Sequence, residues 1–319
     1  MKEKFIISVD LGGTKILSAL LSQKNEIVDR VKMATDITKG PHFIVECILD
    51  SIKEILTKNS MIETDIKAIC LGVPGTVDPQ SGFIGNAPNL GIKNFNIKEA
   101  LQNNFKVPVL IENDVNLAAL GIKRFEFNNK VNNMLIVFIG TGIGAALVFN
   151  GKMYRGSSFY AGEIGHMKVS SNGELDSSAG ESTFENLASR TAIVRSILND
   201  IKKGKNTKLI KAGKSKIKSK VLAKAVFDGD KIATKHVDKA CNVIGTVLGS
   251  VTTLLNIDTI VLGGGVIEAM DEYMMPKIIN IFEHSVLPEA GKNVVIVPTK
   301  LGDDAPLYGG VELAAEFLN

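Results

Sequence analysis

The sequence predicts an α/β protein of two lobes, each organised around a sheet that begins with a glycine-rich hairpin. Two pairs of apolar strands return on themselves at glycine and threonine, residues 5–9 with 16–21 and residues 135–139 with 144–149. The hairpins begin about 130 residues apart, which indicates an internal duplication. We therefore expect two lobes of related construction, with the hairpin tips facing one another across a cleft.

Composition describes an ordinary globular protein. Of 319 residues, 45% are hydrophobic and 22% are charged, enough to bury a large core. A net charge of +3 is small for this length and argues against a nucleic-acid-binding surface spread over the molecule. Cys47, Cys70 and Cys241 lie far apart, without the paired spacing of a disulfide framework or a cysteine metal site. A reducing, cytoplasmic location is expected.

Two further stretches bear on membranes and nucleic acids. The start, MKEKFIISVDLGG, has too short an apolar run for a signal peptide, and no later stretch reaches about 18 uninterrupted apolar residues. The strongly basic run 202–220 lacks the interleaved aromatic residues of a nucleic-acid contact, so we expect it to face water. Neither a membrane nor a nucleic acid is an expected partner.

The turn of the first hairpin, DLGGTK at residues 10–15, holds residue types that bind phosphate. Glycine tolerates positive φ and lets the backbone approach a ligand, so the amides of residues 12–15 and the threonine hydroxyl could cradle a phosphate. Asp10 ends the strand beside them and could hold a magnesium ion through water. Most glycine-rich turns bind nothing, but the similar turn at 140–142 favours a nucleotide site.

Between the hairpins the chain alternates helix, strand and loop. Residues 42–58 have the pattern of an amphipathic helix and residues 66–73 that of a buried strand. The segment 81–95 is rich in glycine, asparagine and proline, so we expect it to be loop. Asn86 and Asn89 offer amides suited to hydroxyl groups, although asparagine is also common in turns.

The candidate catalytic residue follows this loop, in the stretch KVPVLIENDVNLAAL. A β-branched apolar run at 107–111 predicts a strand and residues 115–124 a helix, so Asp114 should lie where a strand ends. Open α/β sheets bind ligands beyond the carboxyl ends of their strands, where a carboxylate can take a proton from a hydroxyl. Asn113 and Asp114 could instead only cap the helix, and the two hairpins decide for catalysis.

Past the second hairpin, FYAGEIGHMKV places two polar side chains three residues apart. Glu163 and His166 could point into one pocket that suits a polyol, although a lone histidine is as often a core residue with satisfied hydrogen bonds. Residues 183–201 are expected to form one amphipathic helix with Glu185 near its start. A glutamate in the first turn is often only a partner of the helix dipole.

The C-terminal part contains a third glycine turn. Residues 221–255 are expected to be largely helical, and a strand at 258–262 opens into Gly-Gly-Gly at 263–265 before another helix. This turn could let an adenine or a ribose lie flat on the backbone, or it could permit tight packing of strand on helix. A strand at 294–297 and a closing helix at 305–318 complete the chain.

Taken in order, these motifs make the chain resemble the ROK family of sugar kinases and sugar-responsive repressors, within the actin-like ATPase superfamily. The matching stretches are VDLGGTK, VPGTVD, APNL, ENDVNLAALG, GTGIG, AGEIGH, ENLAS, VLGGG and LGDDAPLYG. Each motif is loose, but their order is specific and covers almost the whole chain. The resemblance implies a two-lobed actin-like ATPase (ribonuclease H-like) fold with the active site in the interlobe cleft. Its small lobe would be residues 1–115 plus 304–319, and its large lobe residues 116–303.

The resemblance also implies a role for each candidate residue. Asp114 would be the base that takes a proton from a sugar hydroxyl as it attacks the γ-phosphate of ATP, with magnesium near Asp10 bridging phosphate oxygens. The phosphates would be held by Gly12, Gly13, Thr14, Lys15, Thr141 and Gly142. The adenosine would be bordered by Gly264 and Gly265. The sugar hydroxyls would be bound by Asn89, Asn113, Glu163, His166 and Glu185.

The sequence departs from the family pattern at a zinc site. Many members join the histidine that matches His166 to three cysteines, whereas here those positions hold Asp176, Ser178 and Thr183. Zinc prefers thiolate and imidazole ligands, so we predict that no zinc is bound. Without metal, the second ring nitrogen of His166 needs another partner, such as a backbone carbonyl.

The favoured function is therefore ATP-dependent phosphorylation of a hexose, first of all glucose to glucose 6-phosphate. A kinase for N-acetylmannosamine, fructose or another hexose is the alternative, and polyphosphate as the donor also stays open. A sugar-binding regulator would share the same body. Family repressors place a helix-turn-helix domain ahead of it, and only nine residues precede Asp10. An actin-like structural or chaperone ATPase would lack the polyol-binding residues, and the resemblance implies a homodimer.

Overall fold

The computed structural model describes residues 4–170, 182–210 and 217–318. The zinc-motif positions Asp176 and Ser178 therefore lie outside the described residues, as does part of the basic run. The chain divides into two compact units that are described separately below. The first unit is Met1–Lys130, Met153–Ala161 and Asp303–Asn319, and the second is Val131–Lys152 and Gly162–Gly302.

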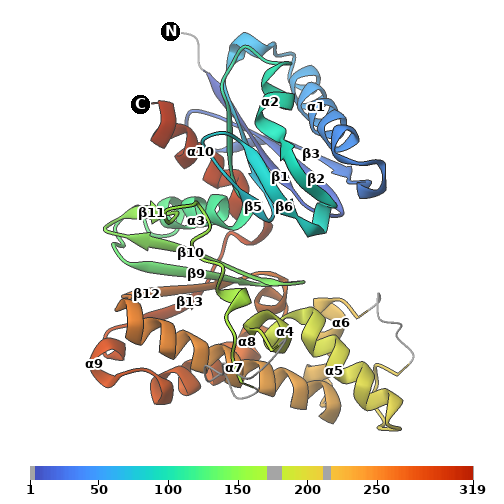
Figure 1. The fold of residues 1–319 in the computed structure, drawn as a ribbon, viewed down its shortest axis with the longest axis vertical. Coiled ribbons are helices and arrows are strands. Elements are labelled where there is room, and N and C mark those ends of the chain that lie inside the picture. Colours follow the sequence, from blue (N-terminus) through green and yellow to red (C-terminus); the bar gives the residue numbers. More distant parts are fainter. Residues whose placement is uncertain (1–3, 171–181, 211–216, 319) are drawn as a thin grey trace. The chain divides into compact units, whose positions relative to one another are not determined.

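The first unit is built on a five-stranded sheet of order β3-β2-β1-β4-β8 (Figure 1). β1, β2 and β3 pair antiparallel, whereas β1, β4 and β8 run parallel, so the carboxyl ends of these last three strands meet at one edge. The hairpin and buried strands predicted from the sequence are confirmed. The strands are β1 (Phe5–Leu11), β2 (Lys15–Leu21), β3 (Ile27–Ala34), β4 (Ile66–Val73) and β8 (Val109–Asn113).

Helices cover both faces of this sheet because its strands are apolar on both sides. On one face lies α1 (Pro41–Lys58), whose buried isoleucines recur at helical spacing. On the other face α3 (Asp114–Phe125) and α10 (Ala305–Leu318) pack against each other. A Cβ at Gly121 would lie 2.2 Å from the Ala305 carbonyl oxygen, so this close contact requires glycine.

A small antiparallel sheet of order β5-β6-β7 follows β4 in the first unit. The expectation that residues 81–95 are loop was wrong, because Ile84, Ala87 and Ile92 are buried in the core and lie in two short strands that pair. Ile84 and Ala87 are three positions apart, so no alternating pattern marks these strands in the sequence, and Gly82 and Gly91 occupy turns with positive φ. The elements here are β5 (Thr76–Val77), β6 (Phe83–Ala87), β7 (Ile92–Asn96) and α2 (Ile97–Gln102).

The second unit repeats the first sheet's plan. Its order is β11-β10-β9-β12-β13, with β10 antiparallel to β9, and with β12 parallel to both β9 and β13. A short strand, β11, continues the sheet where the chain leaves this unit. An antiparallel hairpin joined to two parallel strands thus occurs twice, as the predicted duplication requires. The strands are β9 (Met134–Ile139), β10 (Ile143–Phe149), β11 (Lys152–Tyr154), β12 (Thr259–Gly263) and β13 (Val295–Pro298).

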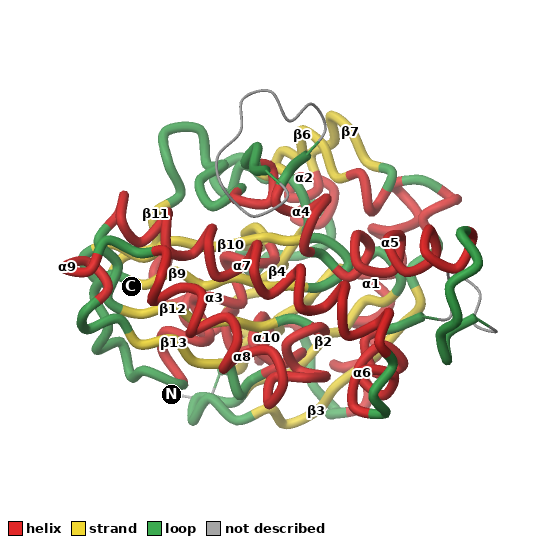
Figure 2. Tube along the Cα trace, turned by 90° about the horizontal axis from the view of Figure 1, so that it is seen from below, coloured by secondary structure: helices red, strands yellow, loops and turns green. Residues whose placement is uncertain are grey.

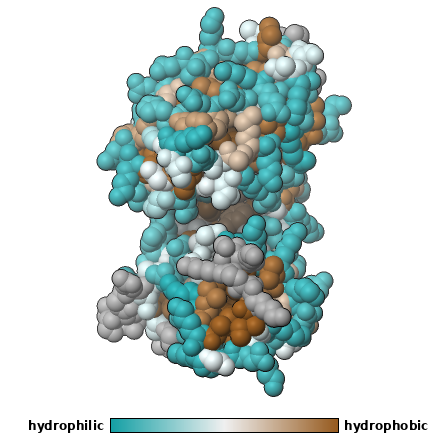
Figure 3. Space-filling view, turned by 90° about the vertical axis from the view of Figure 1, so that its right-hand side faces the viewer, coloured by the Kyte–Doolittle hydropathy of each residue, from teal (hydrophilic) through white to brown (hydrophobic). Residues whose placement is uncertain are grey.

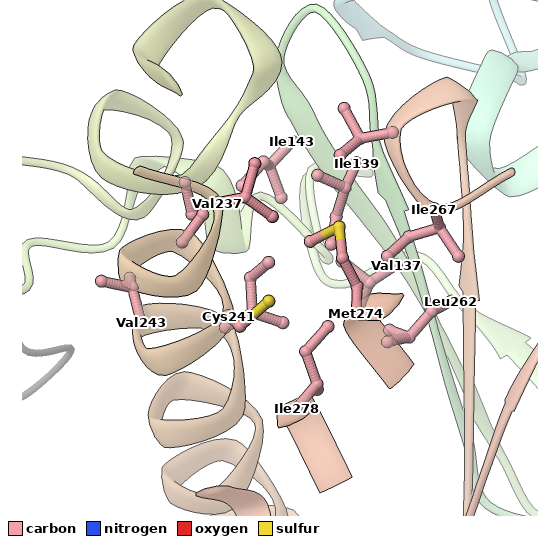
Figure 4. Close-up of a cluster of buried hydrophobic side chains, with 14 of the residues drawn as sticks. Val137, Ile139, Ile143, Val237, Cys241, Val243, Leu262, Ile267, Met274 and Ile278 are labelled. Carbon is pink, nitrogen blue, oxygen red and sulfur yellow. The ribbon is translucent and has the colours of Figure 1, made fainter. Parts of the chain in front are cut away.

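Long helices pack on this second sheet. α7 and α8 lie side by side in Figures 1 and 2, and their apolar side chains meet β9 and β12 in the cluster of Figure 4, which includes Val137, Leu262, Cys241 and Met274. The helices of the second unit are α4 (Phe184–Ala188), α5 (Arg190–Lys202), α6 (Ser219–Phe227), α7 (Lys231–Leu255), α8 (Gly265–Ser285) and α9 (Pro288–Gly291).

The single helix expected over 183–201 is two helices. Ser189 has extended backbone, with ψ of 162°, and its hydroxyl accepts a hydrogen bond from the Ala192 amide at 3.2 Å to cap α5. Thr183 caps α4 in the same way, accepting from the Asn186 amide. Thr183 and Ser189 are therefore N-cap residues, and each of them marks the start of a separate helix.

The two units also differ in extent from the expected lobes, which met at residues 115 and 116. Residues 116–130 belong to the first unit, because α3 packs on α10. The segment Met153–Ala161 also belongs to the first unit. None of the described helices is long and apolar enough to cross a membrane. The face in Figure 3 is mostly hydrophilic, with apolar side chains gathered in one area of the second unit.

Asp200 on α5 should make the stability of this protein depend on pH. Hydrogen bonds from Lys205, at 2.9 Å, and His236, at 3.0 Å, lower the pKa of Asp200 from its ordinary value to about 2. A depressed folded-state pKa stabilises the protein above the unfolded value, and this contribution is lost as pH falls from about 4 to 2. We expect Asp200→Asn to lower the melting temperature at pH 7. The melting temperature of this variant should then fall less between about pH 4 and 2 than that of the unmodified protein.

Thermal unfolding followed by circular dichroism at pH 7, 5, 4 and 2.5 measures this effect. Asp228→Asn is the matched control, because Asp228 makes a more exposed ion pair with Lys224. An Asp200 variant whose melting temperature parallels that of the unmodified protein at all four pH values would contradict the assignment.

Candidate functional site

The β8–α3 junction presents Asp114 at the carboxyl edge of the first sheet. Asn113 ends β8 and caps α3, with its Oδ1 accepting from the amides of Val115 and Asn116 at 2.9 and 3.1 Å. Its Nδ2 donates to the Gly75 carbonyl at 3.1 Å, which fixes the side chain. Helix capping is thus performed by Asn113, while Asp114 opens the helix and is only partly buried. The capping interpretation holds for the asparagine, and Asp114 Oδ1 also accepts from the Val115 amide at 2.9 Å.

Asp10 and Asp114 influence each other across this edge. Asp10 pairs in register with Gly72 of β4, and Gly72 pairs with Glu112 of β8. Burial raises the pKa of Asp10 to about 7; the negative charge of Asp114 adds to this, while Lys15 opposes it. Among the described residues, no group of three or more His, Cys, Asp or Glu side chains could hold a metal ion, so the structure itself adds nothing to the predicted magnesium site.

The tip of the first hairpin is closed by its own backbone. The Gly12 amide donates to the Lys15 carbonyl at 2.8 Å, and a Cβ at Gly13 would lie 2.7 Å from the Asn89 carbonyl oxygen. Thr14 is exposed, and the Lys15 ammonium contacts Asp303 at 2.5 Å. The hairpin therefore brings residues 12–15 against the segment that holds Asn89, whose side chain is exposed.

In the second unit, Glu185 lies directly on the second hairpin. Its Oε2 accepts from the Ile143 amide at 2.8 Å, and a Cβ at Gly142 would lie 2.2 Å from the same oxygen. Glycine at position 142 thus makes room for the carboxylate. The sequence predicts that the hairpin binds phosphate and that Glu185 binds sugar, and in the structure the hairpin and Glu185 are in direct contact.

The loop with Glu163 and His166 joins this cluster. A Cβ at Gly165, between them, would lie 2.2 Å from the Ile143 carbonyl oxygen and 3.5 Å from the Glu185 Cβ. His166 Nε2 lies 3.7 Å from Glu163 Oε2, and both side chains are exposed at the turn Ile164–His166. A buried core histidine is therefore wrong for His166, and the pair can meet a polar ligand.

One residue that contacts the second hairpin is not among the site residues predicted from the sequence. Arg190, the first residue of α5, donates from its guanidinium to the Thr141 hydroxyl at 2.7 Å and from its amide to the Gly140 carbonyl at 2.9 Å. Thr191 adds a hydrogen bond to the Thr141 carbonyl at 2.7 Å. The signal for this contact was Ser189, since its capping role places the next two residues at a helix start.

The third glycine turn serves packing at one of its two candidate positions. Gly264 has φ of +84°, and a Cβ there would lie 2.8 Å from the Ile139 backbone. Gly265 is exposed, and a Cβ there would meet only the Ser219 hydroxyl at 3.4 Å. Close packing against the end of strand β9, together with the positive φ, explains Gly264, and Gly265 presents open backbone at the start of α8.

Fold and residues together define a class. Two sheets with the same order, each beginning with a glycine-threonine hairpin, are the actin-like ATPase fold of sugar kinases. Within that class, the chain belongs to the ROK family, whose sequence pattern matches residues 6–316. The resemblance inferred from the motifs is confirmed.

Comparisons with individual proteins support sugar phosphorylation. The chain is 33% identical over 316 residues to a glucokinase of Halalkalibacterium halodurans, covering 97% of this chain and 94% of that protein. It is similar in structure to a ROK family glucokinase from Streptomyces griseus in complex with glucose and AMPPNP, with a TM-score of 0.82 and 26% identity over 98% and 99% of the two chains.

Regulators are also among the relatives. The chain is 29% identical over 259 residues to a putative xylose repressor of a Caldicellulosiruptor species, covering 81% of this chain and 65% of that protein. Family membership alone therefore does not decide between a kinase and a sugar-responsive regulator, and the arrangement of the candidate residues has to carry the functional argument.

Proposed function

We propose that this protein is an ATP-dependent sugar kinase in which Asp114 acts as the general base. The observation that carries the proposal is the arrangement at one edge of the first sheet, where the charge of Asp114 acts on Asp10, which lies in β1 just before the glycine turn. Asn113 caps α3, and the Asp114 carboxylate, whose Oδ1 accepts from the Val115 amide at 2.9 Å, would take the proton of an attacking hydroxyl. The similarity to two glucokinases supports glucose, giving glucose 6-phosphate, as the first substrate to test.

Phosphate binding is assigned to both hairpins. The backbone of Gly12 and Gly13, with the Thr14 hydroxyl and the Lys15 ammonium, suits phosphate oxygens, and Thr141 with Gly142 provides a second hydroxyl and amide. Asp10 would hold magnesium, directly or through water. Bound there, magnesium would neutralise charge on the phosphates. Gly265 offers the open backbone proposed to border adenosine, with Gly264 shaping the turn.

Sugar binding is assigned to polar side chains in each unit. Asn89 and Asn113 belong to the first unit, and Glu163, His166 and Glu185 surround the start of β10 in the second. Amide and imidazole groups can donate to and accept from the hydroxyls of a hexose, and carboxylates can accept from them. Glu185 keeps one carboxylate oxygen on the Ile143 amide, which orients the other.

Arg190 adds a positive charge to the second hairpin, so Arg190→Ala should weaken nucleotide binding. The guanidinium bonded to the Thr141 hydroxyl can turn to a phosphate, and charge-assisted hydrogen bonds to phosphate are strong. We expect the KM for ATP to rise about threefold to tenfold, with the sugar KM nearly constant. Arg195→Ala is the matched control, because Arg195 on the same helix bonds the Asn186 carbonyl instead. Equal ATP KM values in the two variants would contradict this role.

The test of the proposed function is a coupled ADP-release assay with ATP and magnesium against glucose, N-acetylmannosamine, N-acetylglucosamine, fructose, mannose and allose. Turnover on one sugar establishes the kinase and identifies its substrate, and a parallel assay with polyphosphate tests the alternative donor. Sugar binding by calorimetry without turnover on any of the six would instead favour a regulator. Light scattering tests the proposed homodimer.

A further inference from the structure

The residue before Asn113 is a buried carboxylate for which the proposed mechanism gives no role. The Glu112 side chain is 1% exposed at the end of β8. A charged carboxylate is costly to bury unless it is paired and hydrogen-bonded. Its surroundings therefore have to supply both positive charge and donors.

Both are present. Glu112 Oε2 accepts from the Arg155 Nε at 2.7 Å, and the Arg155 NH2 group reaches Glu316 of α10 at 2.8 Å. Burial by itself would lower the pKa of Arg155, but the two carboxylates raise it above its ordinary value. The guanidinium therefore stays charged and joins β8 to α10 within the first unit.

The other carboxylate oxygen acts on the junction that presents Asp114. Glu112 Oε1 accepts from the Asn113 amide at 3.0 Å and from the Asn116 Nδ2 at 3.1 Å. It thus ties the last residue of β8 to the first turn of α3, on either side of Asp114. A shift of Glu112 would move both anchors of that turn together.

Arg155 also orders the segment that leads to the sugar loop. Its carbonyl accepts from the Ala161 amide at 3.1 Å and closes the chain between them into a loop. Glu163 follows eight residues after Arg155 in the sequence. The same arginine therefore contacts the catalytic junction through its side chain and shapes the approach to the sugar-binding residues through its backbone.

We propose that Glu112 and Arg155 form a positioning pair that sets the Asp114 carboxylate for proton transfer. The proposal rests on Asp114 being the base. Neither residue touches the substrate in this role. A misplacement of about 1 Å can cost on the order of a hundredfold in rate, so loss of the pair should appear in kcat more than in binding.

Arg155→Met and Glu112→Gln test the pair against a matched control, Arg124→Met. Arg124 makes a similar ion pair, at 2.6 Å to Glu312, at the far end of α3 from Asp114. Kinetics are measured well below the melting temperature of every variant. We expect kcat to fall about tenfold to a hundredfold in Arg155→Met and in Glu112→Gln, with less than threefold change in either KM. Arg124→Met should lower the melting temperature but keep kcat within about twofold.

The double variant and a conservative one separate positioning from stability. If the two residues act as one unit, the double variant Glu112→Gln with Arg155→Met should lose no more kcat than the less active of the two single variants. Arg155→Lys retains a charge and should recover part of the rate. An Arg155→Met protein with reduced melting temperature and normal kcat would show the pair to be structural only and overturn the inference. Undiminished turnover in Asp114→Asn would instead overturn the general-base role of Asp114, on which this proposal rests.

Discussion

Asp114→Asn should abolish nearly all sugar-dependent ADP release, lowering kcat by about two to four orders of magnitude. Asparagine has nearly the same shape and retains the Oδ1 acceptor, so the hydrogen bond from the Val115 amide, at 2.9 Å, can persist. The carboxamide cannot accept the proton of the attacking hydroxyl. Sugar and ATP binding, followed by calorimetry, should stay within a few-fold of the unmodified protein.

Asp36→Asn is the control for this substitution. Asp36 likewise accepts a hydrogen bond from a backbone amide at a helix start in the first unit, that of Thr38 at 3.2 Å, but it lies on the exposed segment after β3. Near-normal turnover in the Asp114 variant, with the control equally active, would reject the general-base role. Loss of turnover together with loss of sugar binding would point to a binding role instead.

Local patterns predicted most of the fold because they are strong where elements are long and apolar. The first hairpin, β4 and α10 agree with expectation to within a residue or two. Failures fell where local residue preference conflicts with pairing. Residues 81–95 have the composition of a loop, and only the pairing of β6 with β5 and β7 makes them strands. The helical pattern of residues 183–201 continues through Ser189, and it does not show that the Ser189 hydroxyl caps a new helix.

The candidate site was predicted one motif at a time, and its contacts were not. Glu112 stood in the Glu-Asn-Asp motif, but its partner Arg155 lies 43 positions away, and nothing in either segment joins them. Part of the rise in the pKa of Asp10 likewise comes from the charge of Asp114, added to the larger effect of burial, and the parallel pairing of β1, β4 and β8 brings Asp114 near. Sequence patterns identify residue types at strand ends, whereas charges acting on one another depend on which strands are neighbours.

Gly142→Ala should damage the second cluster through a single methyl group. That Cβ would lie 2.2 Å from Glu185 Oε2, closer than any real contact, so the carboxylate has to leave the Ile143 amide. Without this hydrogen bond the Glu185 carboxylate loses its fixed orientation toward the sugar, so kcat/KM for the sugar should fall about tenfold to a hundredfold. ATP KM should also rise, because the same backbone is assigned to phosphate.

Gly140→Ala on the same hairpin separates this contact from general loss of glycine flexibility. A Cβ at Gly140 meets nothing within 4 Å, and neither glycine has positive φ, so both alanines are compatible with the backbone. The Gly140 variant should keep most of its activity. Equal losses in the two variants would mean that backbone freedom matters and the Glu185 contact does not. A selective loss in Gly142→Ala, reproduced by Glu185→Gln in sugar KM, would place Glu185 on the sugar.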